Sequence, residues 1–514
     1  MSERNTKIII VLGLVIFLGA ILLQKINLPA ADLGRHIING ELFITQHKIL
    51  ATNFYSYTYP DFPFVNHHWG SGVIFYLVYK LFSFAGLSWF YSMIGILTFL
   101  LFFDVARREA GVKTAGFVSI IFIPLLAVRA EVRPEAFSYL FAGIIFWLSY
   151  RVWTGKINWK YLFLVFLSSV LWVNLHIYFV FGFGIIGAFF ISSIVKYLKR
   201  KDAEFFAKVK FFIWSLVLVF IGSLINPFFF KGLQAPLNIF QDYGYRIVEN
   251  QSVYFLSRII PYPASRYFLI GLSVLFISLL LFVWERKLHQ IKFNLPFFIF
   301  SVFFSLIGFL MVRNFTLFAY FAIPLTCFWL KPKVRHIEGV EKENYFLTYF
   351  VLIFSFFLIN VPFWQHRSFG AGLEQGVNLA AEFYKSNGLK GPIMNNYDIG
   401  GYLIYHLYPR ERVFVDNRPE VYPSGFFQNT YIPMQENKEV WKEMDEKYLF
   451  QTVFFYRLDM TPWAQSFLIS LLEDKAWSPV FVDDYNIIFV KTSGPNASIA
   501  EKFRIPRETF QISH

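Results

Sequence analysis

Long apolar runs separated by short basic clusters constrain the fold of this chain more than any other feature of its sequence. Most of the runs approach the roughly 20 residues that an α-helix needs to cross a bilayer. They lie at about 8–24, 88–106, 114–128, 136–150, 161–174, 177–195, 211–226, 267–284, 294–312, 315–330 and 344–361. Only 16% of the residues are charged, against roughly 25% in soluble domains. The sequence therefore predicts a polytopic α-helical membrane protein with about eleven transmembrane helices.

The basic residues between these runs predict the orientation of the chain. They form the clusters Arg4/Lys7, Arg107/Arg108/Lys113, Arg151/Lys156/Lys160, Lys196 to Lys210, Arg286/Lys287/Lys292 and Lys331 to Lys342. Successive clusters after the second are separated by two runs, so all can face the cytoplasm, as the positive-inside rule requires. This holds only if 72–86 does not cross, and we expect an interfacial or re-entrant helix there. The N-terminus is then cytoplasmic and the C-terminal region extracytoplasmic, in a multi-pass protein of the cell membrane. The net charge of +13 forms no single patch, so nucleic acid is not an expected partner.

Three segments expected outside the membrane are long or unusually polar: 25–87, 227–266 and everything after Val361. We therefore expect a transmembrane module at 1–361 and an extracytoplasmic domain at 362–514. Few charges fall inside the apolar runs, whereas transporters usually carry charged or broken helices near mid-membrane. Any chemistry is expected at the outer face.

The sequence after Ala371 alternates between helix and strand patterns, which predicts a small α/β domain with a largely parallel sheet. Helices are expected at 375–387, 401–407, 424–431, 437–446 and 462–473, and strands at 392–396, 412–416, 451–456, 478–482 and 487–490. Asp416 would end a hydrophobic strand, where α/β folds often place ligand groups. The alternative is that Asp416 caps the turn that follows.

Polar motifs recur in three of the expected outer segments. The first segment contains Ala31-Asp32-Leu33-Gly34-Arg35-His36, Asn39-Gly40, Asn53 to Thr58 and Asn66-His67-His68-Trp69-Gly70. The second motif is the charged turn Arg129 to Glu135. The third comprises Asn395 to Leu403 and Val413-Phe414-Val415-Asp416-Asn417-Arg418-Pro419-Glu420.

Together with the layout of the chain, these motifs resemble the GT-C superfamily of membrane glycosyltransferases, especially bacterial relatives of the protein-mannosyl and aminoarabinose transferases. The resemblance implies a GT-C-like fold, a lipid-linked sugar donor and a cell-envelope location. It also implies an essential acid just beyond the first helix, which is Asp32 here. The chain has no WWDxG-like element after Ala371, and Leu33 follows Asp32 where protein mannosyltransferases have an Asp-Glu pair. The acceptor is therefore not implied.

Asp32 is our candidate for the catalytic base, because partial desolvation where the first helix leaves the bilayer would make it a stronger base. The alternative is that Asp32 caps an amphipathic helix at 33–44. Glu135 is a candidate second catalytic acid. It follows Pro134 at a helix start, where an acid also favours the helix dipole.

Cationic and imidazole side chains complete the expected site. Arg129, Arg133 and Arg313 lie at outer helix ends and could clamp the donor phosphate, or snorkel to lipid headgroups. Arg35, His36, His67, His68 and His176 are candidates for substrate binding. The last three, with Asp32 or Glu135, could instead hold a divalent metal ion, or pack beside Trp69 and Trp172 in an aromatic belt. No cofactor is otherwise expected.

The function expected from these features is transfer of a sugar from a polyprenyl-phosphate-linked donor to an extracytoplasmic protein, lipid or glycan acceptor. Membrane lipids are the other expected partners. The alternative is a non-catalytic membrane assembly or binding protein, or a transporter of lipid-linked intermediates. A binding protein would tolerate the loss of Asp32, and a transporter should show internal repeats or broken helices.

Overall fold

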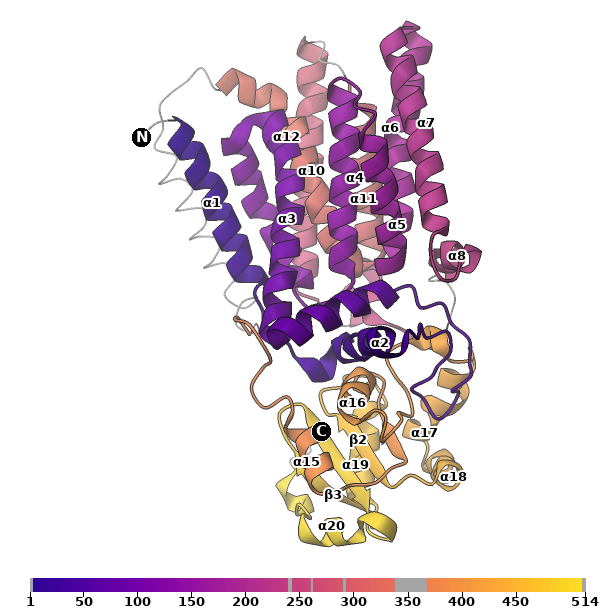
Figure 1. Ribbon diagram of the computed structural model, residues 1–514. Coiled ribbons are helices and arrows are strands. Elements are labelled where there is room, and N and C mark those ends of the chain that lie inside the picture. The colour runs from indigo at the N-terminus through magenta and orange to yellow at the C-terminus, as the bar shows by residue number, and fades with distance from the viewer. Residues whose placement is uncertain (1–2, 239–242, 260–261, 290–292, 338–367, 511–514) are drawn as a thin grey trace. The chain divides into compact units, whose positions relative to one another are not determined.

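The computed structural model describes residues 3–238, 243–259, 262–289, 293–337 and 368–510. The chain forms two compact units (Figure 1). Residues 1–24, 88–236 and 247–370 are named the helical unit, and residues 25–87, 237–246 and 371–514 the sheet unit. The boundary expected after Val361 places 25–87 and 237–246 with the membrane module, whereas their contacts group them with the C-terminal region. The sheet unit is thus assembled from three separate stretches of chain.

The helical unit contains long apolar helices that run side by side, together with two short helices of nine and seven residues (Figure 1). They are α1 (Glu3–Leu22), the later part of α3 (Trp69–Leu126), α4 (Glu135–Thr154), α5 (Tyr161–Leu175), α6 (Val180–Arg200), α7 (Ala203–Leu224), α8 (Phe230–Asn238, which ends across the unit boundary), α9 (Val253–Ile259), α10 (Ala264–His289), α11 (Leu295–Leu310) and α12 (Phe315–Ile337). Six helices among the described residues are long and apolar enough to cross a membrane, and α5 and α11 are shorter apolar helices. The expected run 344–361 lies outside the described residues. Aromatic stacking fills this core, as between Phe304 and Phe321, whose ring centroids are 3.7 Å apart.

Helix α3 contains the expected segment 72–86 and the two expected crossings that follow it. A straight helix of its 58 residues would be about 87 Å long, far beyond a hydrocarbon core of about 30 Å. Positive φ angles at Ser83 (59°) and Gly111 (77°) interrupt it. Residues up to Leu87 belong to the sheet unit, where Tyr79 Oη lies 2.7 Å from Tyr405 Oη. The non-crossing placement of 72–86 stays a prediction.

The sheet unit contains a four-stranded sheet in the order β1-β2-β4-β3. The strands are β1 (Ile393–Asn395), β2 (Thr452–Tyr456), β3 (Trp477–Val482) and β4 (Asn486–Lys491). Only β1 and β2 pair in parallel, while β4 pairs antiparallel with both neighbours. The expectation of a largely parallel sheet is therefore wrong. The reason is local: β3 and β4 are joined by a short turn, which allows only an antiparallel hairpin.

The helices of the sheet unit pack against the sheet or against one another. They are α2 (Leu33–Gln46), α15 (Leu379–Ser386), α16 (Gly400–Leu407), α17 (Pro433–Glu436), α18 (Lys438–Tyr448), α19 (Ala464–Glu473) and α20 (Ala497–Lys502), with a π-helical turn at Phe427–Tyr431. The core between them is rich in buried aromatic residues, including Phe414, Tyr431 and Trp477. Tyr245, from the stretch 237–246, stacks on Tyr397 with ring centroids 4.4 Å apart.

The expected strand at 412–416 does not join the sheet. Val413 instead pairs with the first outer segment, donating from its N–H to Tyr55 O (3.0 Å) and accepting from Tyr57 N–H (3.1 Å). The residue after Val413 is held by a side chain: Phe414 N–H donates a hydrogen bond to Asn395 Oδ1 (2.9 Å). The backbone of Val413 thus pairs with residues more than 350 positions away, while Phe414 forms a bend and bonds to Asn395.

Candidate functional site

The first candidate site, named the Asp32 group, lies in the sheet unit. Asp32 occupies the N-cap position of α2, yet its side chain makes no capping hydrogen bond, which speaks against the capping alternative. Its Oδ1 instead accepts a hydrogen bond from Nδ2 of Asn417. Arg35 lies on the other side of this pair, with Nη2 3.9 Å from Asp32 Oδ2 and Nε 3.3 Å from Asn417 Oδ1. The Asp32 side chain is 31% exposed, so it is both anchored and accessible.

Glycines allow α2 and α16 to approach each other at this point. A Cβ added to Gly34 would lie 2.6 Å from Gly401 O, and one added to Gly401 would lie 3.1 Å from Ala31 O. A Cβ on Gly400 would lie 2.5 Å from the Cα of Asp416. The Gly400-Gly401 pair of the third sequence motif is therefore explained by close backbone packing beside Asp32.

Asp416 and Arg418 form a buried ion pair next to Asn417. Arg418 donates from Nε and Nη2 to the two carboxylate oxygens of Asp416, at 2.9 and 2.5 Å, and its Nη2 also contacts Asn53 Oδ1 at 3.3 Å. Burial alone would lower the pKa of Arg418, but the Asp416 carboxylate raises it above its usual range. Asp416 also accepts from Arg418 N–H (3.1 Å). Asp416 therefore closes a turn, and it is fully buried rather than presented as a ligand group.

Glu420 is a titratable residue of the sheet unit that ends the third sequence motif, but no role was assigned to it from the sequence. Burial raises the pKa of its carboxyl, and the nearby charges of Arg418 and Arg35 lower it in part. Its place in the motif does not predict the raised pKa, because that depends on burial by long-range packing.

Three of the candidate histidines, His36, His67 and His68, come together in the sheet unit. The rings of His67 and His68 are 4.0 Å apart, and those of His36 and His68 are 5.5 Å apart, in each case between centroids. His67 Nδ1 lies 3.0 Å from Val65 O. In the part of the chain that the structure describes, no three His, Cys, Asp or Glu side chains are grouped to hold a metal ion. The expected ligands, which are His67, His68 and His176 with Asp32 or Glu135, are therefore not grouped around a metal site in this structure. We derive no step through a metal ion.

The second candidate site, named the arginine–glutamate group, lies in the helical unit and joins residues from three parts of the sequence. Glu135 is buried between Arg129 Nε (3.4 Å) and Arg313 Nη2 (3.0 Å). Glu249 accepts two hydrogen bonds from Arg129, both at 2.6 Å, and lies 3.2 Å from Arg133 Nη1. The structure thus brings together the three arginines that the sequence proposed as one clamp, and pairs them with two carboxylates.

Glu249 is the member of this group that sequence reasoning missed. Burial alone would raise the pKa of its carboxyl, but Arg129 and Arg133 hold it well below its usual range. The segment that carries Glu249 is held in place by the next residue, Asn250, whose Oδ1 accepts a hydrogen bond from Arg313 Nη1 at 2.8 Å. Glu249 lies in a loop without helical periodicity, and its only sequence signal was its place in the polar segment 227–266.

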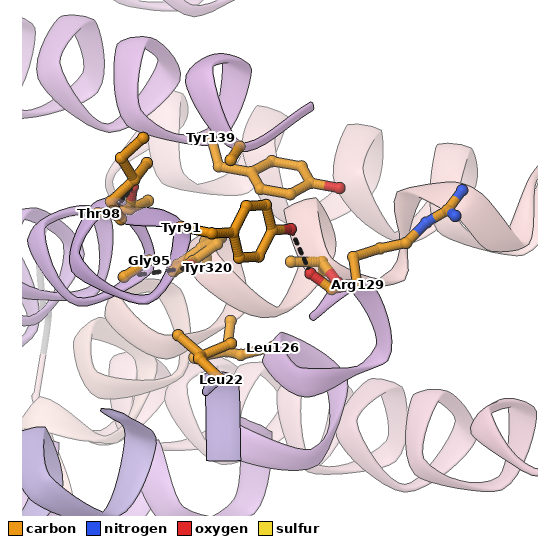
Figure 2. Close-up of a pocket in the computed structure, with 11 residues that line it drawn as sticks. Leu22, Tyr91, Gly95, Thr98, Leu126, Arg129, Tyr139 and Tyr320 are labelled. Carbon is orange, nitrogen blue, oxygen red and sulfur yellow. Dashed lines mark hydrogen bonds between the residues drawn. The ribbon is translucent and has the colours of Figure 1, made fainter. Parts of the chain in front are cut away.

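A small cavity lies beside the backbone of Arg129 (Figure 2). Tyr91 donates to Arg129 O at 2.5 Å, and Tyr320 donates to Gly95 O at 3.3 Å. The cavity volume is about 10 Å³, which is the space of about one water molecule. It is too small for an isoprenoid chain.

His176 belongs to the helical unit and is oriented by Ser138. Its Nδ1 lies 2.7 Å from Ser138 Oγ, which also accepts from Trp172 Nε1 at 2.7 Å. His176 is 2% exposed. His176 and Trp172 share this hydroxyl, which agrees with the alternative that His176 packs beside Trp172.

No protein-family model matches the sequence, and no curated protein matches it. Solved structures do share its fold. The oligosaccharyltransferase AglB of Archaeoglobus fulgidus, in complex with an inhibitory peptide and a dolichol-phosphate, is 14% identical, with a TM-score of 0.56 over 92% of this chain and 74% of AglB. A second structure of that enzyme, in complex with Zn and sulfate, is 13% identical, with a TM-score of 0.52 over 93% of this chain and 73% of the enzyme. ArnT of Cupriavidus metallidurans, bound to undecaprenyl phosphate, is 10% identical, with a TM-score of 0.53 over 98% of this chain and all of ArnT. Both proteins are GT-C membrane glycosyltransferases, so the expected resemblance is confirmed for the fold.

Proposed function

We propose that this chain is a membrane glycosyltransferase that moves a sugar from a polyprenyl-phosphate carrier to an acceptor at the extracytoplasmic face. The neighbours support a lipid-linked donor, since AglB was solved with a dolichol-phosphate and ArnT with undecaprenyl phosphate. In this proposal the N-terminus is cytoplasmic and the sheet unit is extracytoplasmic.

The observation that carries the proposal is the hydrogen bonding and exposure of the Asp32 side chain. A carboxylate at a helix N-cap normally accepts the N–H groups of the first turn, but Asp32 is turned to Asn417 and Arg35 instead. The Asn417 hydrogen bond anchors it beside the charge of Arg35, while 31% of its side chain stays exposed. A general base requires this combination of fixed direction and access to the proton that it removes.

The chemistry follows from this placement. The acceptor nucleophile attacks the anomeric carbon from the side opposite the phosphate, and its proton passes to the Asp32 carboxylate. The bond from the anomeric carbon to the phosphate oxygen breaks, and polyprenyl phosphate leaves with that electron pair. The product is glycosylated acceptor with inverted anomeric configuration.

The arginine–glutamate group is our proposed contact for the donor phosphate. Guanidinium groups stabilise the charge that grows on a departing phosphate. Arg129 and Arg313 are held at fixed positions by the buried Glu135, so little reorganisation is needed when the charge develops. The role of Glu135 as a second catalytic acid stays a prediction, as do the substrate-binding roles of Arg35 and of His36, His67, His68 and His176.

The test uses detergent-purified protein and a panel of polyprenyl-phosphate sugars, and it measures release of free polyprenyl phosphate with a panel of acceptors. Asp32→Asn should abolish release, while Asp61→Asn, a matched change at an exposed position of the same unit, should leave it intact. Release that survives Asp32→Asn would contradict the proposed base, whereas no release from the wild type across the whole panel would favour a binding or assembly role.

A further inference from the structure

The side-chain amide of Asn417 is held between a cation and a carboxylate. Its Oδ1 faces Nε of Arg35 at 3.3 Å, and its Nδ2 donates to Oδ1 of Asp32. Arginine can only donate, and an ionised carboxylate can only accept. The two neighbours therefore dictate which end of the amide faces Asp32, and a flipped amide would lose both bonds.

The backbone on either side of Asn417 is clamped. Asp416, one residue before, is fully buried, and its N–H donates to the Tyr422 hydroxyl at 3.0 Å. Arg418, one residue after, is tied to both oxygens of Asp416 and to Asn53. Buried charges of this kind are unfavourable unless each is paired, and here both are. The pair therefore fixes the position from which the Asn417 side chain extends.

A third contact limits the movement of the amide. A Cβ added to Gly401 would lie 3.6 Å from Asn417 Nδ2 and 3.6 Å from the Cα of Asp32. The first turn of α16 thus packs against both members of the hydrogen bond. Since Asp32, Arg35, Asn417 and Gly401 all belong to the sheet unit, these contacts lie within one compact body.

We propose that Asn417 is a positioning residue for the catalytic base, and that the C-terminal region supplies it to a carboxylate located directly after the first helix. This inference rests on the proposed function of Asp32. By engaging one oxygen, Asn417 fixes the plane of the carboxylate and so sets the direction in which its other oxygen points. A base misplaced by about 1 Å can lose about 100-fold in rate, so the orientation matters as much as the charge.

The competing explanation is that Asn417 only fastens the C-terminal region to α2. The two explanations predict a different order of turnover for two variants of similar size. Asn417→Asp keeps the shape and can still accept from Arg35, but it places a second carboxylate against Asp32. Asn417→Leu removes both hydrogen bonds and adds no charge. A positioning role makes Asn417→Asp the worse variant for turnover, whereas a packing role makes it the milder one.

The chain offers a matched control in Asn396. Its Nδ2 donates to Asp459 Oδ2 at 2.9 Å, and it is buried in the same unit. Asn396→Asp therefore creates the same kind of carboxylate pair at a more deeply buried place without a catalytic role, so its loss of stability should be at least as large.

The experiment measures kcat, the donor KM and the thermal midpoint of the full-length protein, for wild type, Asp32→Asn, Asn417→Asp, Asn417→Leu and Asn396→Asp. We expect Asn417→Asp to lose about 100-fold or more in kcat, with a donor KM within about threefold of wild type. Asn417→Leu should lose less, and Asn396→Asp should keep wild-type kcat despite a lowered midpoint. Wild-type turnover in Asn417→Asp, or an equal loss in Asn396→Asp, overturns the positioning role if Asp32→Asn is inactive. Turnover that survives in Asp32→Asn overturns the proposed base itself, and the positioning role with it.

Discussion

Replacing Glu249 with glutamine should tighten the binding of a polyprenyl phosphate rather than weaken it. Glu249 presents two carboxylate oxygens to Arg129 at 2.6 Å each and also contacts Arg133. A phosphate binds arginine through the same two-pronged geometry. If the arginines hold the donor phosphate, Glu249 occupies their donors first and the phosphate must displace it.

The expected size of the effect follows from these contacts. Hydrogen bonds to charged groups contribute roughly 1.5–3 kcal/mol net each, and exposed ion pairs contribute about 0–1 kcal/mol. The Glu249 side chain is 30% exposed, while that of Arg129 is 8% exposed. We therefore take a value near the lower limit for the whole interaction, about 1.4 kcal/mol, which corresponds to a tenfold change in Kd. The loop should stay in place in the variant, because Asn250 remains bound to Arg313.

The assay is a titration of detergent-purified protein with undecaprenyl phosphate, followed by the quench of tryptophan fluorescence or by calorimetry. Glu249→Gln should lower the Kd about tenfold, whereas Arg133→Gln should raise both the Kd and the donor KM. Glu131→Gln is the matched control, because Glu131 also binds Arg133 (2.7 Å) but is 62% exposed. It should change the Kd less than twofold, as expected for an exposed pair. A higher Kd in Glu249→Gln would refute the competition and show that Glu249 orients the arginines for the phosphate.

Two further predictions concern the stability of the sheet unit. Burial lowers the pKa of His406 to about 3, so the unfolded chain binds a proton that the folded chain does not. The free energy of unfolding should therefore fall as pH drops below about 6.5, by at most about 1.4 kcal/mol per pH unit. His406→Leu should flatten the dependence of the thermal midpoint on pH. Parallel curves of midpoint against pH for the variant and the wild type would contradict this. Gly400→Ala should destabilise the chain by about 1–3 kcal/mol through overpacking, because the new Cβ would lie 2.5 Å from the Cα of Asp416 and 2.7 Å from Val415 O. Gly184→Ala, where nothing lies within 4 Å, should be close to neutral, and an equal loss in both variants would refute the packing argument.

The sequence predicted those features of the candidate site that are marked by a local pattern. Asp32 was recognisable because the resemblance to GT-C glycosyltransferases implies an acid just after the first apolar run. Arg129, Arg133 and Arg313 were recognisable because each is expected at the outer end of an apolar helix. Membrane helices give such patterns, since the bilayer fixes their length and excludes charge from their middle.

The partners of these residues could not be read from the sequence. Asn417 is 385 positions away from Asp32, and Glu249 is 120 positions away from Arg129. The parallel sheet was wrongly inferred from alternation alone, although the short link between β3 and β4 indicated a hairpin. Pairing across such distances is decided by tertiary packing, which one sequence does not display.

The composite origin of the sheet unit has a consequence for how the protein is made. Residues 25–87 are synthesised before residues 371–514, yet the two stretches belong to one compact unit. Asp32 therefore spends most of the synthesis of the chain without Asn417 beside it. If Asn417 orients the base, a nascent chain that has already inserted its helices is still catalytically silent. Competence then arrives only when residues 371–510 have been synthesised and have folded together with residues 25–87.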